Sequence, residues 1–199
     1  MRWRVALAFL FLTSASAHAA EEPRELTVAG HVVLGTLRLP SQHGQDTPLV
    51  LMTHGTLAHK DMEVIQGLSK ALAERGIASL AHTLALGVDR RKGMYDCGTG
   101  HDYTMDDAAA EIDAWIAEAR RMSQRVYLLG HSRGGNQVAH YLASHPVAPV
   151  AGAILLAPAT AKVETSLRAA YAETFGQALE PLLARADEAV AAGRGAEWM

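Results

Sequence analysis

The hydrophobic positions of the chain fall into short apolar runs that are separated by longer segments with helical periodicity. Apolar runs typical of strands cover residues 26–28, 31–39, 49–52, 77–81, 125–129 and 150–156. Gly30 stands between the first two runs, where a tight turn is expected. The pattern therefore predicts a hairpin at the start, followed by more widely spaced strands.

Helical spacing of apolar residues occupies the segments between the later strands. These segments are residues 62–73, 104–122 and 136–144, and a further helical stretch begins near residue 165. Asp61 is the expected N-cap of the first helix, and Gly76 is expected to end it. Thr104 and Asp107 have the spacing of a capping box, with Asp in place of the usual Glu, at the start of the second.

Strands that alternate with helices of these lengths predict an α/β fold, with a mostly parallel sheet covered by helices on both faces. Residues 20–160 are expected to form this core. Residues 161–199 are expected to form a helical segment, which Gly176 and Pro181 divide into two helices. A composition of 49% apolar and 20% charged residues suits one globular domain.

The first 19 residues predict a secretory signal peptide. Arg2 and Arg4 give it a positive start, residues 5–12 are apolar, and residues 17–19 have the small-x-small pattern of a cleavage site near Ala19. A helix that spans a bilayer needs about 20 apolar residues, so this run is too short for one. We therefore expect a periplasmic or secreted protein with no membrane contact after cleavage; a retained anchor is the alternative.

Charge and cysteine content exclude other classes of protein. The net charge is −3 without a long block of like charges, so we expect no nucleic-acid partner. Cys97 is the single cysteine, which is either a free thiol or paired outside this chain. Cys97 and His101 lack the further ligands of a structural zinc site, and we expect no metal.

The sequence Gly130-His131-Ser132-Arg133-Gly134 matches the pattern G-x-S-x-G. An apolar strand is predicted before it and a helix after it. This context is the one required for a nucleophile elbow, in which a sharp turn exposes the serine hydroxyl. A tight turn with an incidental serine is the alternative.

A second motif, His54-Gly55-Thr56, follows an earlier buried strand. Acyl transfer requires two N–H donors that point at the developing oxyanion. One comes from the residue after the nucleophile, and the other comes from the loop after an earlier strand. Arg133 and Thr56 hold these positions; a simple strand-ending turn at His54-Gly55 is the alternative.

On these motifs the chain resembles the α/β-hydrolase superfamily, and within it the serine esterases and serine-aminopeptidase-like hydrolases with a short H-G-x loop. The resemblance rests on residues 49–56, 126–136 and 150–158, and it extends over about residues 24–160. It implies an eight-stranded, mostly parallel sheet, a hydrolytic serine, a small-molecule ester or amide substrate, and no organic cofactor. Residues 161–199 resemble the lid of many relatives.

The C-terminal part of the chain departs from this family pattern. In the family, an acid and then a histidine follow the serine on two later strands. No strand-like run follows Ala157 and no histidine follows His145, which stands at the end of the elbow helix and is expected to face away from Ser132. We therefore expect a truncated chain that lacks the last two strands, the catalytic acid and the catalytic histidine.

Other groups could serve as a base. His82 ends a predicted strand at the carboxyl edge of the sheet, His131 is next to the serine, and His101 and Asp102 could form a pair. We expect each of them to be structural or solvated. The charged loop over residues 87–101 lies at the same edge, either as a substrate entrance or as a solvated surface.

Three functional hypotheses follow. The first is a serine hydrolase that cleaves an ester or amide bond through Ser132, impaired by the missing acid and histidine. The second is a non-catalytic remnant or ligand-binding protein on the same scaffold, and acyl transfer to an acceptor other than water is a third possibility. The substrate and the oligomeric state stay open.

Overall fold

The computed structural model describes residues 20–96, 98–100, 102–158 and 163–195. The predicted signal peptide, Cys97 and His101 lie outside these residues. Within them, no helix is long and apolar enough to cross a membrane. The fold described below concerns this part of the chain.

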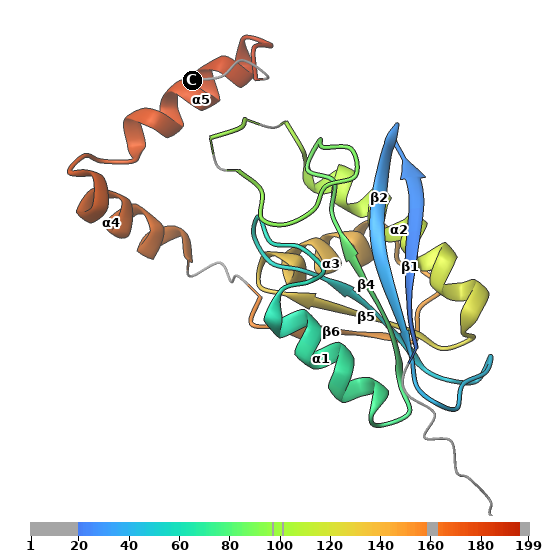
Figure 1. Cartoon of the computed structure of the whole chain (residues 1–199). Helices are drawn as coiled ribbons and strands as arrows, with labels where there is room; N and C mark the ends of the chain where they lie inside the picture. Colours follow the sequence, from blue (N-terminus) through green and yellow to red (C-terminus); the bar gives the residue numbers. More distant parts are fainter. Residues whose placement is uncertain (1–19, 97, 101, 159–162, 196–199) are drawn as a thin grey trace, which may run out of the picture.

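A six-stranded sheet with the order β1-β2-β4-β3-β5-β6 forms the centre of the structure (Figure 1). Its strands are β1 (Ala20–Val28), β2 (His31–Leu39), β3 (Leu49–Thr53), β4 (Ala78–Thr83), β5 (Val126–His131) and β6 (Gly152–Leu156). The pairs β1–β2 and β2–β4 are antiparallel, whereas β4, β3, β5 and β6 run parallel. The predicted α/β fold with a mostly parallel sheet is confirmed.

Helices cover both faces of this sheet, as the alternating pattern predicts. They are α1 (Glu63–Ala73), α2 (Met105–Met122) and α3 (Arg133–Ser144), followed by α4 (Val163–Phe175) and α5 (Glu180–Ala191). In Figure 1, α1 covers one face of the sheet, and α2 and α3 cover the other. Gly176 lies between α4 and α5, and Pro181 lies in the first turn of α5. The predicted division of this segment into two helices is confirmed.

The first hairpin is longer than the apolar pattern indicates. Ala29 and Gly30 form its turn, both with positive φ (48° and 85°), as expected for a two-residue hairpin connection. β1 begins at Ala20 rather than at residue 26, and it pairs with β2 as far as Leu39. The extra residues include charged side chains, and pairing with β2 rather than hydrophobicity makes them a strand.

The ends of α1 test two of the predicted signals. Asp61 is not the N-cap: Met62 holds that position without a side-chain cap, and the carboxylate of Asp61 accepts a hydrogen bond from Lys60 Nζ at 2.7 Å. α1 begins at Glu63, one residue later than predicted, so Asp61 precedes the N-cap position. Gly76 has a φ of 75°, and its N–H donates to the carbonyl of Ala73, so the predicted helix end is confirmed.

The starts of α2 and α3 differ in how well the sequence predicts them. The capping box of α2 is confirmed, because Thr104 Oγ1 accepts from the N–H of Asp107 and the carboxylate of Asp107 accepts from the N–H of Thr104. α3 begins at Arg133, three residues before the predicted start. Gly134 and Gly135 suggest a turn in the sequence, yet they are buried in the first helical turn.

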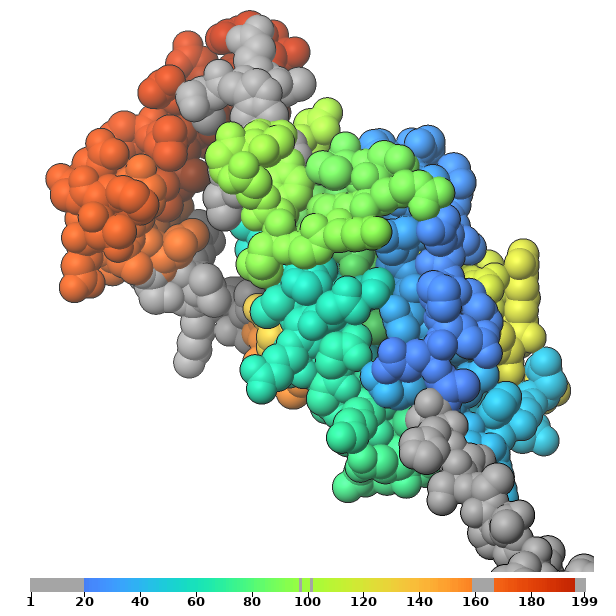
Figure 2. Space-filling model, viewed as in Figure 1, coloured from blue at the N-terminus to red at the C-terminus, as the bar shows by residue number. Residues whose placement is uncertain are grey.

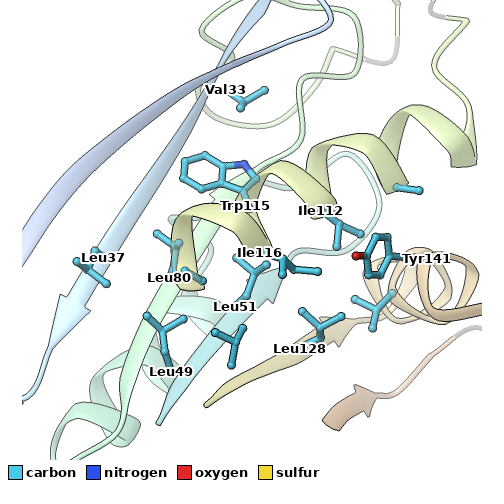
Figure 3. Packing of buried hydrophobic residues seen from close by; sticks show 14 of the residues in the cluster. Val33, Leu37, Leu49, Leu51, Leu80, Ile112, Trp115, Ile116, Leu128 and Tyr141 are labelled. Atoms are coloured by element: carbon cyan, nitrogen blue, oxygen red, sulfur yellow. The ribbon is translucent and has the colours of Figure 1, made fainter. Parts of the chain in front are cut away.

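The larger core cluster lies between the sheet and the pair α2 and α3 (Figure 3). Trp115 of α2 is completely buried and points toward β2, where Gly35 leaves room for its ring. A Cβ at Gly35 would stand 2.6 Å from the Trp115 ring. On the opposite face, Ile65 of α1 packs against residues of β3, β4 and β5.

The far side of the structure is less covered. β6 pairs with β5 alone among the described strands, and Ile154 and Leu155 are 48% and 44% exposed. Beyond β6, α4 and α5 form a lobe apart from the sheet (orange to red in Figures 1 and 2). Apolar side chains of this lobe, including Phe175 and Val190, are exposed as well. The described sheet therefore ends in an apolar edge.

Two glycine substitutions test the packing of this core. Gly35→Ala forces the buried Trp115 ring to move, so we expect the free energy of unfolding to fall by about 1–3 kcal/mol. Gly67→Ala, in the interior of α1 with open space around it, should instead raise the free energy of unfolding by about 0.5–1 kcal/mol. Urea unfolding measures both, and equal effects of the two substitutions contradict the contact between β2 and α2.

Candidate active site

Ser132 occupies a strained turn between β5 and α3. Its φ is 54° and its ψ is −123°, a conformation that non-glycine residues rarely adopt. The N–H of Ser132 donates to the carbonyl of Leu156 in β6 at 2.9 Å, and its carbonyl accepts from the N–H of Gly135 at 2.9 Å. The strand–turn–helix geometry predicted for the elbow is therefore present.

Gly134 and Gly55 allow this turn to pack against the loop after β3, and Gly130 allows the end of β5 to approach the first turn of α3. A Cβ at Gly130 would stand 2.3 Å from the carbonyl oxygen of Gly134. A Cβ at Gly134 would stand 2.3 Å from the carbonyl oxygen of His54, and one at Gly55 would stand 3.3 Å from Ser132 Cβ. The two predicted motifs are thus brought together in space, and Gly130 and Gly134 have no room for a side chain.

A cavity of about 60 Å³ lies beside this contact. Its lining combines the loop after β3, the segment after β4, and the start of α3. The lining residues are His54, Gly55, Thr56, Leu57, Leu84, Leu86, Tyr103, Arg133 and Gln137. Thr56 and Arg133, the predicted oxyanion residues, therefore border the same cavity.

His54 is buried beneath the loop after β3 and is 1% exposed. Its Nε2 accepts hydrogen bonds from the N–H of Leu84 at 3.0 Å and from Arg91 Nη2 at 3.2 Å. Its Nδ1 lies 2.8 Å from the carbonyl oxygen of Gly55. Burial lowers the pKa of His54 to about 4, so the ring is neutral near pH 7.

The predicted charged loop contains one buried arginine. Arg91 is 5% exposed, and its guanidinium bonds to groups of three segments. A solvated surface therefore does not describe the whole loop, although Asp89 and Arg90 are exposed. Asp89 accepts from the N–H of Val32 at 2.6 Å and Arg90 pairs with Glu25 at 2.8 Å, which attaches the loop to the hairpin.

Glu111 of α2 is buried behind the same loop. Both of its carboxyl oxygens lie 3.1 Å from the N–H of Ala85, and one accepts from the hydroxyl of Tyr103 at 2.9 Å. Burial raises the pKa of the Glu111 carboxyl to about 7, despite these donors and the nearby Arg91. Sequence reasoning missed both Arg91 and Glu111, because only their tertiary contacts distinguish them from solvated charges.

His82 lies in the core rather than in the cavity. It is completely buried, and its Nε2 lies 3.0 Å from Thr53 Oγ1. Its ring centroid is 5.8 Å from that of Trp115. Burial lowers the pKa of His82 to about 3, and the prediction of a structural role fits these contacts.

His145 and His131 form no hydrogen bond with Ser132 in the described part of the chain, and His101 lies outside it. His145 stacks on Tyr141 with ring centroids 4.4 Å apart, at the end of α3 that is remote from Ser132. His131 ends β5, and its Nδ1 would be 3.4 Å from a Cβ at Gly55. Asp102 is exposed. Within the described part of the chain, no side chain forms a hydrogen bond with the Ser132 hydroxyl.

Comparisons with known proteins agree with this geometry. A family model described as alpha/beta hydrolase fold matches residues 48–193. A non-heme haloperoxidase from Rhodococcus erythropolis is 36% identical over 85 residues, which are 43% of this chain and 28% of that protein.

Solved structures give the same result. Est1E from Butyrivibrio proteoclasticus has 23% identity and a TM-score of 0.58, over 73% of this chain and 55% of that one. A cold-adapted esterase from an Arctic intertidal metagenomic library has 25% identity and a TM-score of 0.51, over 69% of this chain and 60% of that one. The chain thus spans 60% or less of the length of each of these three relatives.

The buried histidines predict how the stability of the protein depends on pH. His54 and His82 titrate near 6.5 in the unfolded chain, but near 4 and 3 in the folded protein. The unfolded chain therefore binds more protons, and the free energy of unfolding falls as the pH falls from about 6.5 towards 4. We expect each histidine to lower the free energy of unfolding by about 2 kcal/mol or more by about pH 4.5. Urea unfolding over this pH range measures the change.

Glu111 opposes this loss. Its raised pKa gives a stabilising contribution that is fully present below about pH 4.5 and is lost as the pH rises through about 7. Glu111→Gln removes that gain on acidification, so its free energy of unfolding should fall more steeply than that of the wild type between about pH 7 and pH 4.5. If the free energy of unfolding of Glu111→Gln depends on pH as steeply as that of the wild type, the raised pKa of the buried Glu111 carboxyl is contradicted.

Proposed function

Because the chain belongs to the α/β-hydrolase fold family, we propose that it is a serine hydrolase in which Ser132 attacks the carbonyl carbon of an ester or amide. The strained conformation of Ser132 at the junction of β5 and α3 is the observation that carries this proposal. Such strain persists only where the surrounding structure enforces it, and it is common at active sites.

The oxyanion formed by this attack requires N–H donors. We assign them to Thr56 and Arg133, which border one cavity beside the serine. Arg133 begins α3, whose positive end also stabilises negative charge at this place. Removing one such donor typically reduces the rate by about 10²–10³-fold.

The reaction also needs a base for the Ser132 proton. We exclude His54 and His82, because both rings are almost completely buried and their bonded nitrogens, both of His54 and Nε2 of His82, contact groups other than Ser132. The proposal therefore assigns the nucleophile and the oxyanion donors, and leaves the histidine and its acid unassigned among the described residues. Est1E has been solved with ferulic acid, and we propose a small-molecule ester as the first substrate class to test.

We predict that a fluorophosphonate probe labels Ser132 of the 199-residue chain. Added imidazole should accelerate labelling, since it can accept the hydroxyl proton that no described histidine accepts. Mass spectrometry of the labelled peptide identifies the residue. Ser132→Ala should abolish labelling, whereas Ser144→Ala, an exposed serine of the same helix, should label like the wild type.

Two outcomes contradict the hydrolase. One is a folded wild-type chain that is not labelled with or without imidazole, which favours the ligand-binding protein on the same scaffold. The other is labelling that persists in Ser132→Ala. Product analysis with an added alcohol separates hydrolysis from acyl transfer.

We also propose that residues 1–19 direct export and that the mature chain begins near Ala20. This proposal rests on the basic start and the short apolar run of the sequence. N-terminal sequencing of the protein from the periplasm or the medium should begin near Ala20. A chain found in the cell with Met1 retained contradicts export.

A further inference from the structure

The buried Arg91 has an unusual set of partners. Its Nε–H donates to the carbonyl of Leu84 at 2.7 Å and its Nη1–H to that of Gly93 at 2.9 Å. Its Nη2 lies 2.8 Å from the carbonyl oxygen of Ala58 and 3.2 Å from His54 Nε2. A guanidinium has only donors, so each of these partners accepts.

This constraint determines the tautomer of His54. Nε2 accepts from Arg91 and also from the N–H of Leu84, so it carries no proton. The ring proton of the neutral imidazole is therefore on Nδ1. Nδ1–H then donates to the carbonyl of Gly55 at 2.8 Å.

The same contact orients the next peptide unit. In a trans peptide the C=O and the N–H point in opposite directions. The Gly55 carbonyl is held by His54 and by the N–H of Ala58, at 2.8 and 3.3 Å, so the N–H of Thr56 faces away from His54. Gly55 itself lies against Ser132.

We propose that Arg91 is a positioning residue that acts through His54 to orient the N–H of Thr56 toward the oxyanion. Arg91 holds this turn at two places, because it also binds the carbonyl of Ala58. Glu111 accepts a hydrogen bond from the N–H of Ala85 and so restrains the segment after β4. The inference rests on the proposed function, since an oriented donor matters only if Ser132 reacts.

Arg91→Lys tests this proposal, with Arg90→Lys as the matched control. Lysine keeps the charge, but its single ammonium nitrogen cannot reach the four acceptors that the planar guanidinium binds. Arg90 is exposed and pairs with Glu25 instead. We expect the maximal rate constant of fluorophosphonate labelling, with imidazole present, to fall about tenfold or more in Arg91→Lys. Probe affinity should stay within about twofold, and Arg90→Lys should match the wild type in both.

Two substitutions of His54 test the same chain of contacts if Arg91→Lys does not fold. The amide nitrogen of Asn can replace Nδ1–H, whereas that of Gln reaches the position of Nε2. His54→Gln should label about tenfold slower than the wild type or worse, and His54→Asn should label faster than His54→Gln. Nitrogen NMR should also show an Nδ1–H tautomer in the wild type, with an Nε2 chemical shift that changes in folded Arg91→Lys because Nε2 loses one of its two donors.

The outcomes separate this inference from the proposed function. If the wild type is labelled and Arg91→Lys or His54→Gln is labelled equally fast, the inference is wrong and the hydrolase stands. If the folded wild type is not labelled, the proposed function fails and the positioning role fails with it. An unchanged Nε2 chemical shift of His54 in folded Arg91→Lys also contradicts the inference.

Discussion

The candidate site depends on direct contact between two backbone turns at the carboxyl edge of the sheet. The turn at Ser132 and the loop at Gly55 approach so closely that Gly134 has no space for a Cβ. A hydrogen bond from Ser132 to Leu156 also connects the elbow to β6. The strain at Ser132 persists because the sheet, α3 and the neighbouring loop all restrict the same few residues.

A buried polar network supports this contact from the other side. Arg91, His54 and Glu111 lie almost entirely out of solvent, and each has several hydrogen-bond partners. An unsatisfied buried polar group costs about 1–3 kcal/mol, which favours one arrangement of the loops over the alternatives. The histidine of the His54-Gly55 motif is therefore a structural part of the site and not a base.

Local signals in the sequence predict the fold well where the geometry is itself local. The G-x-S-x-G pattern, Gly76 and the box of Thr104 and Asp107 each require nearby backbone geometry, and all three are confirmed. Asp61 failed as a cap because α1 begins at Glu63, which puts Met62 rather than Asp61 at the N-cap position. The role of Arg91 was not predictable, because its burial depends on residues distant in the sequence, such as His54 and Ala58. The missing acid and histidine stay a prediction.

The account is tested most directly by a crystal structure of the chain after reaction with a phosphonate. It predicts a bond between Ser132 Oγ and phosphorus, with the phosphoryl oxygen about 2.7–3.1 Å from the N–H groups of both Thr56 and Arg133. The ring of His54 should still donate from Nδ1 to the carbonyl of Gly55. An adduct on another residue, or a phosphoryl oxygen that faces away from both N–H groups, would contradict it.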